Sequence, residues 1–247
     1  MSKQFFRHVF LALFAFMLWS PIGNAEKVAI DSLLADAVVN NDLAAAQSYL
    51  QSGSADVNKA TAYNQDVPLI TTAIIKNSPE MVALLLEYKA DPNISSKDST
   101  PLLQAIEMQN PEIVQLLIEA GAKVNYDSSA LTPPLLYSIE KFQPDNGLTI
   151  FRYLLNSNAD INAKAADGTT ALMLAANNNT DNQEYMCTIA RELIKKGANR
   201  NLRDSNNKTA LQYATDINFT TMMNILSVSP KNKVKTGLMV PVPVKIR

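Results

Sequence analysis

Residues 81–93 read MVALLLEYKADPN, and residues 113–125 read IVQLLIEAGAKVN. Both stretches carry an apolar triplet followed by a short polar phrase that ends in asparagine. The phrase recurs along the chain, and its closing asparagines are spaced by 35, 32, 37 and 39 residues: Asn58, Asn93, Asn125, Asn162 and Asn201. The apolar positions fall at helical spacing, which buries one helix face against a neighbour. A repeated period in this range predicts a stack of similar units.

A second phrase opens the units. It reads T-P-L at 100–102, D-G-T-T-A-L at 167–172 and T-A-L at 209–211. Threonine at this point can cap a helix by accepting a hydrogen bond from a first-turn N–H. Proline in a first turn loses no hydrogen bond, because that N–H has no helical partner, and Pro79 and Pro111 open second helices in the same way. Each unit is therefore predicted to hold two helices.

Together the two phrases resemble the ankyrin repeat, whose pattern runs near D-x-x-G-x-T-P-L-H-x-A-A and closes with L-L-x-x-G-A-D-V-N. The resemblance covers about six units from Ile30 to Ser227. It implies an all-α fold over residues 26–227, an ankyrin-repeat solenoid of about six helix-turn-helix units with atypical terminal caps. The first unit lacks the opening phrase and the last lacks the closing phrase, as capping units do. The alternative, an irregular helical bundle, would not repeat its caps in register.

Small residues and turn residues support the same interpretation. Paired helices can approach closely where a small residue recurs: Ala73, Ala105, Ser138, Ala175 and Ala214. A left-handed residue after the second helix favours glycine, with asparagine as the next-best choice. We expect that conformation at Gly53, Gly121, Asn158 and Gly197.

The units also depart from the family pattern. Pro68 comes one position early, Pro133 and Pro134 stand together, and extra residues occur around 143–147 and within 177–185. The usual opening histidine is replaced in every unit, by Thr71, Leu103, Leu136, Met173 and Gln212. The two insertions should lie side by side between first and second helices. They are either tolerated surface loops or a paired ridge that recognises a partner.

The first 25 residues have the three-part layout of a secretory signal peptide. Lys3 and Arg7 supply positive charge, residues 9–19 are uninterruptedly apolar, and residues 23–25 (GNA) resemble a cleavage site. A membrane anchor is the alternative, but the run is shorter than the roughly 20 residues that span a bilayer. No cysteine follows the site, which disfavours a lipid anchor. We predict cleavage after Ala25 and a periplasmic or secreted protein.

The rarest residues limit the chemistry. The chain has one histidine, His8, and one cysteine, Cys187. Cleavage after Ala25 would remove the histidine, which excludes Ser-His-Asp and Cys-His catalysis and His-ligated metals. A two-acid glycosidase stays compatible with the composition, although the acids are scattered. We expect Cys187 to be a small core residue, and we predict no catalytic residue, no metal site and no cofactor.

The charge is distributed unevenly. Residues 26–227 carry 15 Lys and Arg against 23 Asp and Glu, which argues against a nucleic-acid partner. Residues 228–247 carry five basic residues and no acid, and their run LMVPVPV at 238–244 forbids helix. This tail is either a disordered end or an extended segment that docks on the body, a partner or an anionic surface.

The resemblance implies a non-catalytic module that binds another exported protein through the concave face. Inner-face positions in units two to six are Ile75, Lys76, Glu107, Met108, Glu140, Lys141, Asn177, Asn178, Asp216 and Ile217. Turn tips are Gln65, Asp66, Lys97, Ser99, Ala130, Thr132, Asp167, Thr169, Asn206 and Lys208. Exposed Ile75, Met108 and Ile217 would be apolar anchors within a polar rim, unless each is simply a solvated or partly packed position. The alternative function is an envelope-associated protein whose basic tail makes a weak contact with an anionic membrane or polymer.

Overall fold

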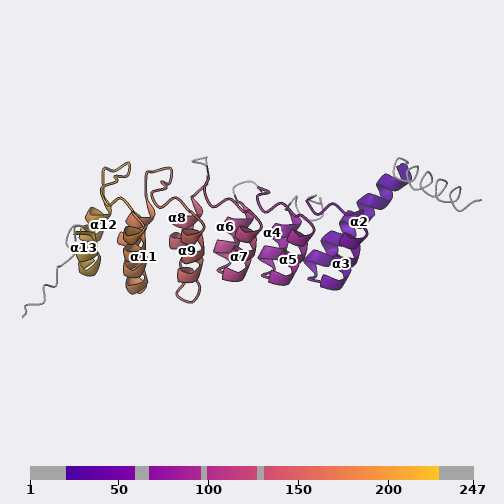
Figure 1. Cartoon of the computed structure of the whole chain (residues 1–247), viewed down its shortest axis with the longest axis horizontal. Coiled ribbons are helices and arrows are strands. Elements are labelled where there is room, and N and C mark those ends of the chain that lie inside the picture. The colour runs from indigo at the N-terminus through magenta and orange to yellow at the C-terminus, as the bar shows by residue number, and fades with distance from the viewer. Residues whose placement is uncertain (1–20, 59–66, 96–98, 127–130, 228–247) are drawn as a thin grey trace, which may run out of the picture.

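The computed structural model describes residues 21–58, 67–95, 99–126 and 131–227, with side chains from Lys27 onward. These residues form twelve α-helices and no β-strand. The helices are α2 (Pro21–Val39), α3 (Leu43–Gln51), α4 (Leu69–Ile75), α5 (Pro79–Glu87), α6 (Pro101–Glu107), α7 (Pro111–Glu119), α8 (Pro134–Glu140), α9 (Gly147–Asn156), α10 (Ala171–Ala176), α11 (Gln183–Lys195), α12 (Ala210–Asp216) and α13 (Thr220–Ser227). They form a row of helix pairs, and the connections between successive pairs lie along one edge (Figure 1).

Each repeat contributes one helix pair to a two-layered stack. The first helices α2, α4, α6, α8, α10 and α12 form one layer, in which each helix contacts the next. The second helices form the back layer, where Arg152 of α9 and Glu192 of α11 make an ion pair at 2.6 Å between Nη2 and Oε1. The predicted all-α solenoid of six helix-turn-helix units is confirmed for the described residues.

The helices begin where the sequence places their caps. Thr100, Thr170 and Thr209 each accept, on the side-chain oxygen, a hydrogen bond from the backbone N–H three residues on. Ser78 and Asn110 cap α5 and α7 in the same way. Each bond satisfies an N–H that has no partner inside the helix. The recurrence of these caps fixes the register of the repeats.

Proline replaces the capping side chain at two helix starts. Pro68 precedes α4 and Pro133 precedes α8, and neither start has a side-chain cap. Both helices nevertheless contain seven residues, as α6 does. The early proline of repeat two therefore leaves the helix register unchanged.

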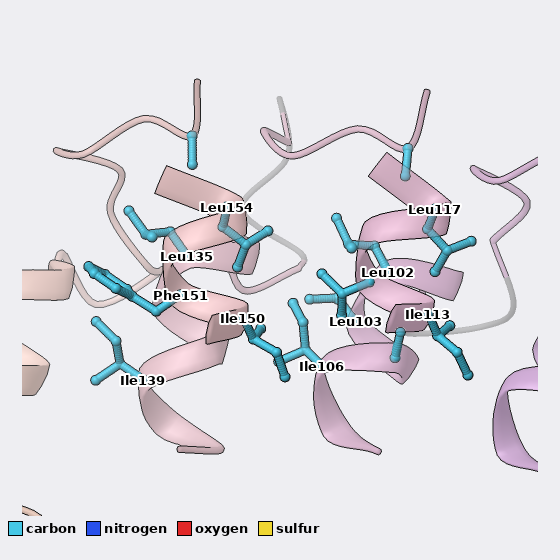
Figure 2. Close-up of a cluster of buried hydrophobic side chains, with 14 of the residues drawn as sticks. Leu102, Leu103, Ile106, Ile113, Leu117, Leu135, Ile139, Ile150, Phe151 and Leu154 are labelled. Carbon is cyan, nitrogen blue, oxygen red and sulfur yellow. The ribbon is translucent and has the colours of Figure 1, made fainter. Parts of the chain in front are cut away.

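The core lies between the two layers and between successive pairs. The five small residues predicted to permit close approach are fully buried: Ala73, Ala105, Ser138, Ala175 and Ala214. Larger buried side chains of neighbouring repeats, such as Ile106 and Phe151, point into the spaces between the helices (Figure 2). Dense packing of this kind makes every repeat depend on its neighbours for burial.

A left-handed residue follows the second helices, as predicted. The backbone φ is 69° at Gly53, 92° at Gly121, 104° at Gly197 and 61° at Asn158. Repeat two uses Lys89 there, at φ 68°. The N–H of the following residue then bonds back into the last helical turn, for example from Ala122 to the Leu117 carbonyl at 2.9 Å. This turn directs the chain toward the closing phrase.

The closing asparagines tie each repeat to the next. In three repeats the asparagine side chain donates from Nδ2 to the carbonyl of the left-handed residue in the next repeat, and its Oδ1 accepts a backbone N–H two residues further on. The bridges join Asn58 to Lys89 and Asp91 (3.1 and 2.7 Å), Asn93 to Gly121 and Lys123 (3.1 and 2.8 Å), and Asn125 to Asn158 and Asp160 (3.0 and 2.8 Å). Asn162 accepts from the N–H of Asn199 at 2.8 Å. These contacts explain why asparagine recurs at the end of the phrase.

The predicted signal peptide and the basic tail lie at the two ends of the chain. Helix α2 begins at Pro21 and continues through Ala25, the residue after which we predict cleavage. Most of the predicted signal peptide, residues 1–20, and the tail, residues 228–247, lie outside the described residues. Cleavage after Ala25 therefore stays a prediction.

Candidate functional site

The ten inner-face residues lie at the C-terminal ends of the first helices or directly after them. Ile75 ends α4 with 49% of its surface exposed, and Lys76 beside it is exposed. Glu107, Glu140, Asn177 and Asp216 are exposed at the equivalent point of the next four repeats. The layer of first helices therefore presents a row of such positions along the stack, which we call the inner row.

Two of the three predicted apolar anchors are placed differently. Met108 and Ile217 are half-buried and pack against the hydrophobic core. Each is the capping residue directly after its helix. The prediction that Met108 and Ile217 are exposed is wrong, whereas the exposure of Ile75 is confirmed.

Glu107 and Lys141 of the inner row meet across the boundary between repeats three and four. Lys141 Nζ lies 2.8 Å from Glu107 Oε1, and the Tyr137 hydroxyl donates to Glu107 Oε2. The hydrogen bonds from Lys141 and then from Tyr137 lower the pKa of Glu107, while burial raises the pKa of Tyr137. Lys141 Nζ also lies 5.3 Å from the centre of the Tyr137 ring. The carboxylate is thus charged and fully engaged.

Repeat six contains a similar arrangement of lysine, tyrosine and carboxylate side chains. Lys208, a predicted turn tip, lies 2.8 Å from Asp216 Oδ2 of the inner row and 5.3 Å from the centre of the Tyr213 ring. The Tyr213 hydroxyl donates to Asp204, whose other oxygen accepts the backbone N–H of Lys208 at 2.8 Å. The Tyr213 bond is the largest cause of the lowered pKa of Asp204. The Lys208 ammonium and the Tyr213 hydroxyl are thus already paired with carboxylates of this chain.

Glu140 differs from its neighbours in the inner row. It forms no hydrogen bond or ion pair among the described residues. Desolvation of its carboxylate raises its pKa, the charge of Lys141 opposes this shift, and the Asp167 carboxylate adds to it. Asp167, a predicted turn tip, accepts from the backbone N–H of Thr169 at 2.9 Å. Asn177 is exposed, and Asn178 Oδ1 accepts from the Thr180 hydroxyl at 2.6 Å, which shapes the inserted loop.

A pocket of about 330 Å³ opens between repeats three and four on the layer of first helices. Its lining residues precede α6 and α8 or project outward from these helices: Ser99, Leu103, Gln104, Glu107, Leu131, Thr132 and Tyr137. Leu103 and Leu131 add apolar surface beside the Tyr137 ring, and polar atoms make up the larger part of the exposed lining. Gln104 and Thr132 make no side-chain hydrogen bond among the described residues. The pocket joins one predicted inner-face residue, Glu107, to two predicted turn tips, Ser99 and Thr132.

The remaining predicted turn tips are separate from this pocket. Gln65, Asp66, Lys97 and Ala130 lie outside the described residues. Asn206 is exposed, and its N–H donates to Asp204 Oδ1 at 3.0 Å. The structure therefore brings two turn tips to the pocket and one, Lys208, to Asp216.

The two insertions lie next to each other, as predicted. They connect α8 with α9 and α10 with α11, and the rings of Phe142 and Tyr185 are 5.3 Å apart. Asn146 Nδ2 donates to the Gln109 carbonyl at 2.9 Å, which holds the first loop to repeat three. A Cβ on Gly147 would lie 2.6 Å from the Phe142 ring. The loops are thus packed against the repeats, but no contact assigns them a partner.

Cys187 lies in α11 with 4% of its surface exposed, which confirms its predicted place in the core. Burial raises the pKa of its thiol. The described residues contain no group of three or more His, Cys, Asp or Glu side chains that could hold a metal ion. No helix within the same ranges is both long and apolar enough for a membrane span.

The family model for ankyrin repeats (three copies) matches residues 34–128 and 138–236. The chain belongs to the ankyrin-repeat family. This ankyrin-repeat protein is 40% identical over 75 residues to an ankyrin repeat protein of Rickettsia bellii (strain RML369-C). The match covers 30% of this chain and 9% of that protein, so the chain spans a small part of the relative's length. The ankyrin fold is generally a non-catalytic scaffold for protein interaction.

Solved structures show the same architecture. The ankyrin-repeat protein is similar to EF0377, an ankyrin repeat protein, with a TM-score of 0.67 and 21% identity over 79% of this chain and 96% of that one. For the human ASB11 ankyrin repeat domain the TM-score is 0.61, with 21% identity over 78% and 81%. A chain in the complex of Bd0816 predatory endopeptidase from Bdellovibrio bacteriovorus with immunity protein Bd3460 has a TM-score of 0.62, with 23% identity over 79% and 96%. At these identities the likeness shows the fold alone.

Sequence reasoning missed the residues that organise the inner face. Tyr137 and Tyr213 both engage a carboxylate, and Gln104 occupies the matching place in α6. The signal was present, because each lies four residues after the capping position of its first helix. The ion pair of Lys141 with Glu107 was not foreseen either, since its partners are 34 residues apart.

Proposed function

We propose that this ankyrin-repeat protein is a non-catalytic module that binds another protein outside the cytoplasm. Its binding surface is the layer of first helices with the adjoining turn tips, centred on the pocket between α6 and α8. The observation that carries the proposal is that pocket, because it brings apolar side chains together with Gln104 and Thr132, whose side chains have no hydrogen-bond partner among the described residues. Pockets of this kind receive the central anchors of protein interfaces.

The surroundings of the pocket suit a protein partner. Half-buried Tyr137 and Tyr213 and exposed Ile75 supply apolar area, and aromatic residues dominate the energetics of such interfaces. The paired charges of Glu107 and Lys141 form a polar rim that is already ordered, which reduces the entropic cost of association. The open, elongated layer favours a macromolecule over a small ligand.

The proposed location rests on the sequence of residues 1–25, which has the layout of a signal peptide. One structural neighbour comes from a complex between an endopeptidase and an immunity protein, and this supports testing exported enzymes first as partners. The location can be checked by sequencing the N-terminus of the protein recovered from the exported fraction. A mature form that begins at Glu26 is expected, and retention in the cytoplasm with an intact N-terminus would rule out this location.

Partner capture tests the binding surface directly. A photo-cross-linking residue at Gln104, in the pocket, should trap a specific protein from the exported fraction. The same residue at Thr149, which is exposed on α9 in the back layer, should trap none. Gln104→Arg, which fills the pocket with a bulky charge, should reduce capture by at least tenfold relative to the matched control Thr149→Arg. Equal capture by both variants would contradict the proposed surface.

A further inference from the structure

The basic tail that follows α13 has no role in the function proposed above. We propose that its apolar segment, residues 238–244, docks into the pocket between α6 and α8 of the same chain and covers it. Occupancy of the pocket requires no partner protein. Its consequence, competition between the tail and the partner, rests on the proposed function.

The pocket offers both apolar and polar surface to the segment. Leu103 is 5% exposed, and Leu131 and the Tyr137 ring extend the apolar surface beside it. Both oxygens of the one carboxylate that lines the pocket, Glu107, are already engaged by Lys141 and Tyr137. An apolar occupant therefore leaves no charge without a partner, which would otherwise be costly.

The polar groups of the pocket match an extended, proline-containing backbone. Pro241 and Pro243 have no backbone N–H, so the segment mainly presents carbonyl acceptors. Gln104 and Thr132 can donate to such carbonyls, and neither has a side-chain partner among the described residues. Extended segments of this kind dock in grooves lined by aromatic rings, where they lose little conformational freedom.

The distribution of charge along the chain favours a tail that runs from the last repeat toward the N-terminal repeats. Residues 30–126 carry 12 Asp and Glu against 5 Lys, whereas residues 127–227 carry 10 Asp and Glu against 9 Lys and Arg. The acidic half of the stack thus begins at the pocket and extends toward the N-terminal repeats. Lys245 and Arg247, directly after the apolar segment, would face that half. Opposite charges attract over about 8–10 Å at ordinary salt concentrations.

The length of the connecting chain is sufficient. Helices packed in layers lie about 8–10 Å apart. The pocket is two to three repeats from the last one along the stack, and α13 ends in the back layer, so the path from α13 to the pocket is about 30 Å. The eleven residues from Ser227 to Leu238 span about 36 Å when extended at about 3.3 Å each. Residue 238 is therefore near the first position of the tail that can reach the pocket.

Cross-linking within the full chain tests the docking without any partner. Purified protein with a photo-cross-linking residue at Gln104 should give, after proteolysis, a cross-linked peptide from residues 236–247. The yield should be independent of protein concentration, as for a contact within one molecule. The same group at Thr149 should give no tail peptide. Val242→Asp, which places a charge within the apolar segment, should lower the Gln104 yield at least fivefold, while Ser229→Asp should not.

Two other results would overturn the docking. A tail cross-link that grows with protein concentration and joins two molecules would assign the segment to a second copy. Retention of the protein on phosphatidylglycerol vesicles, with no tail cross-link from Gln104 in their absence, would assign the tail to an anionic surface. Failure to capture a partner would count against the proposed function alone, because the cross-link to the tail is measured in its absence.

Discussion

The backbone N–H of Asp160 donates to Oδ1 of Asn125 at 2.8 Å, across the boundary between two repeats. The same asparagine donates from Nδ2 to the Asn158 carbonyl at 3.0 Å. One side chain therefore satisfies a donor and an acceptor that helix formation leaves unpaired. The bridge also sets the spacing between the closing phrases of repeats three and four.

Asn125→Ala should destabilise the protein by about 1–2 kcal/mol, because the Asn158 carbonyl and the Asp160 N–H both lose their hydrogen bond to this side chain. The matched control is Asn179→Ala, since Asn179 is exposed in an inserted loop and makes no side-chain hydrogen bond among the described residues. Urea unfolding followed by circular dichroism measures both changes. Equal stability of the two variants would show that the bridge adds nothing to the stack.

Ala105→Leu should strongly destabilise the fold, although both side chains are apolar. Ala105 is fully buried where the helices approach, so three added carbons must displace packed neighbours at a cost of about 1–3 kcal/mol or more. Ala44→Leu is the control, because Ala44 is exposed in α3 and leucine is a good helix former. Thermal unfolding should show a lower midpoint for the first variant only. A similar midpoint for both would argue against close helix packing at Ala105.

Gly147→Ala should destabilise the protein, although alanine is normally more favourable than glycine in a helix. The new Cβ would lie 2.6 Å from the Phe142 ring, which overpacks the junction of the first inserted loop. A loss of about 1–3 kcal/mol is expected in chemical unfolding. In the Phe142→Ala background the same change should cost much less, because the obstructing ring is gone. Additive effects of the two substitutions would refute this contact.

Acid should weaken the last repeat through Asp204. The pKa of Asp204 is lowered, chiefly by the hydrogen bond from Tyr213, so the folded state prefers the carboxylate. Its contribution is complete above the ordinary pKa of about 4 and is lost as the pH falls through the lower folded value. Asp204→Asn should therefore be less stable than the parent at pH 7, and the difference should shrink toward pH 3. A difference that is constant with pH would contradict this origin.

The thiol of Cys187 should be unreactive in the folded protein. It is 4% exposed, and burial raises its pKa, which disfavours the nucleophilic thiolate. Ellman's reagent at pH 8 should label it at least a hundredfold more slowly than a cysteine introduced as Ser205→Cys, which is exposed. Addition of urea should make the two rates similar. Rapid labelling of native Cys187 would mean that α11 opens readily.

The fold was predictable because its signals are local. Thr100 and Thr209 cap helices, and Gly121 takes a left-handed conformation, for reasons that lie within a few neighbouring residues. The inner face was less predictable, because its contacts join different repeats. Periodicity could not show that Met108 turns toward the core while Ile75, at nearly the same place, stays exposed.

The two inserted loops connect helices within a repeat, and such connections lie along the edge of the stack opposite the connections between successive repeats (Figure 1). The asparagine bridges belong to the connections between repeats. The length of the inserted loops can therefore change without disturbing the bonds that fix the distance from one repeat to the next. Residues 179–181, which are exposed, form a natural host site for a foreign epitope or a fluorescent reporter. Evolution has the same freedom there, so relatives can differ in these loops while keeping an identical stack.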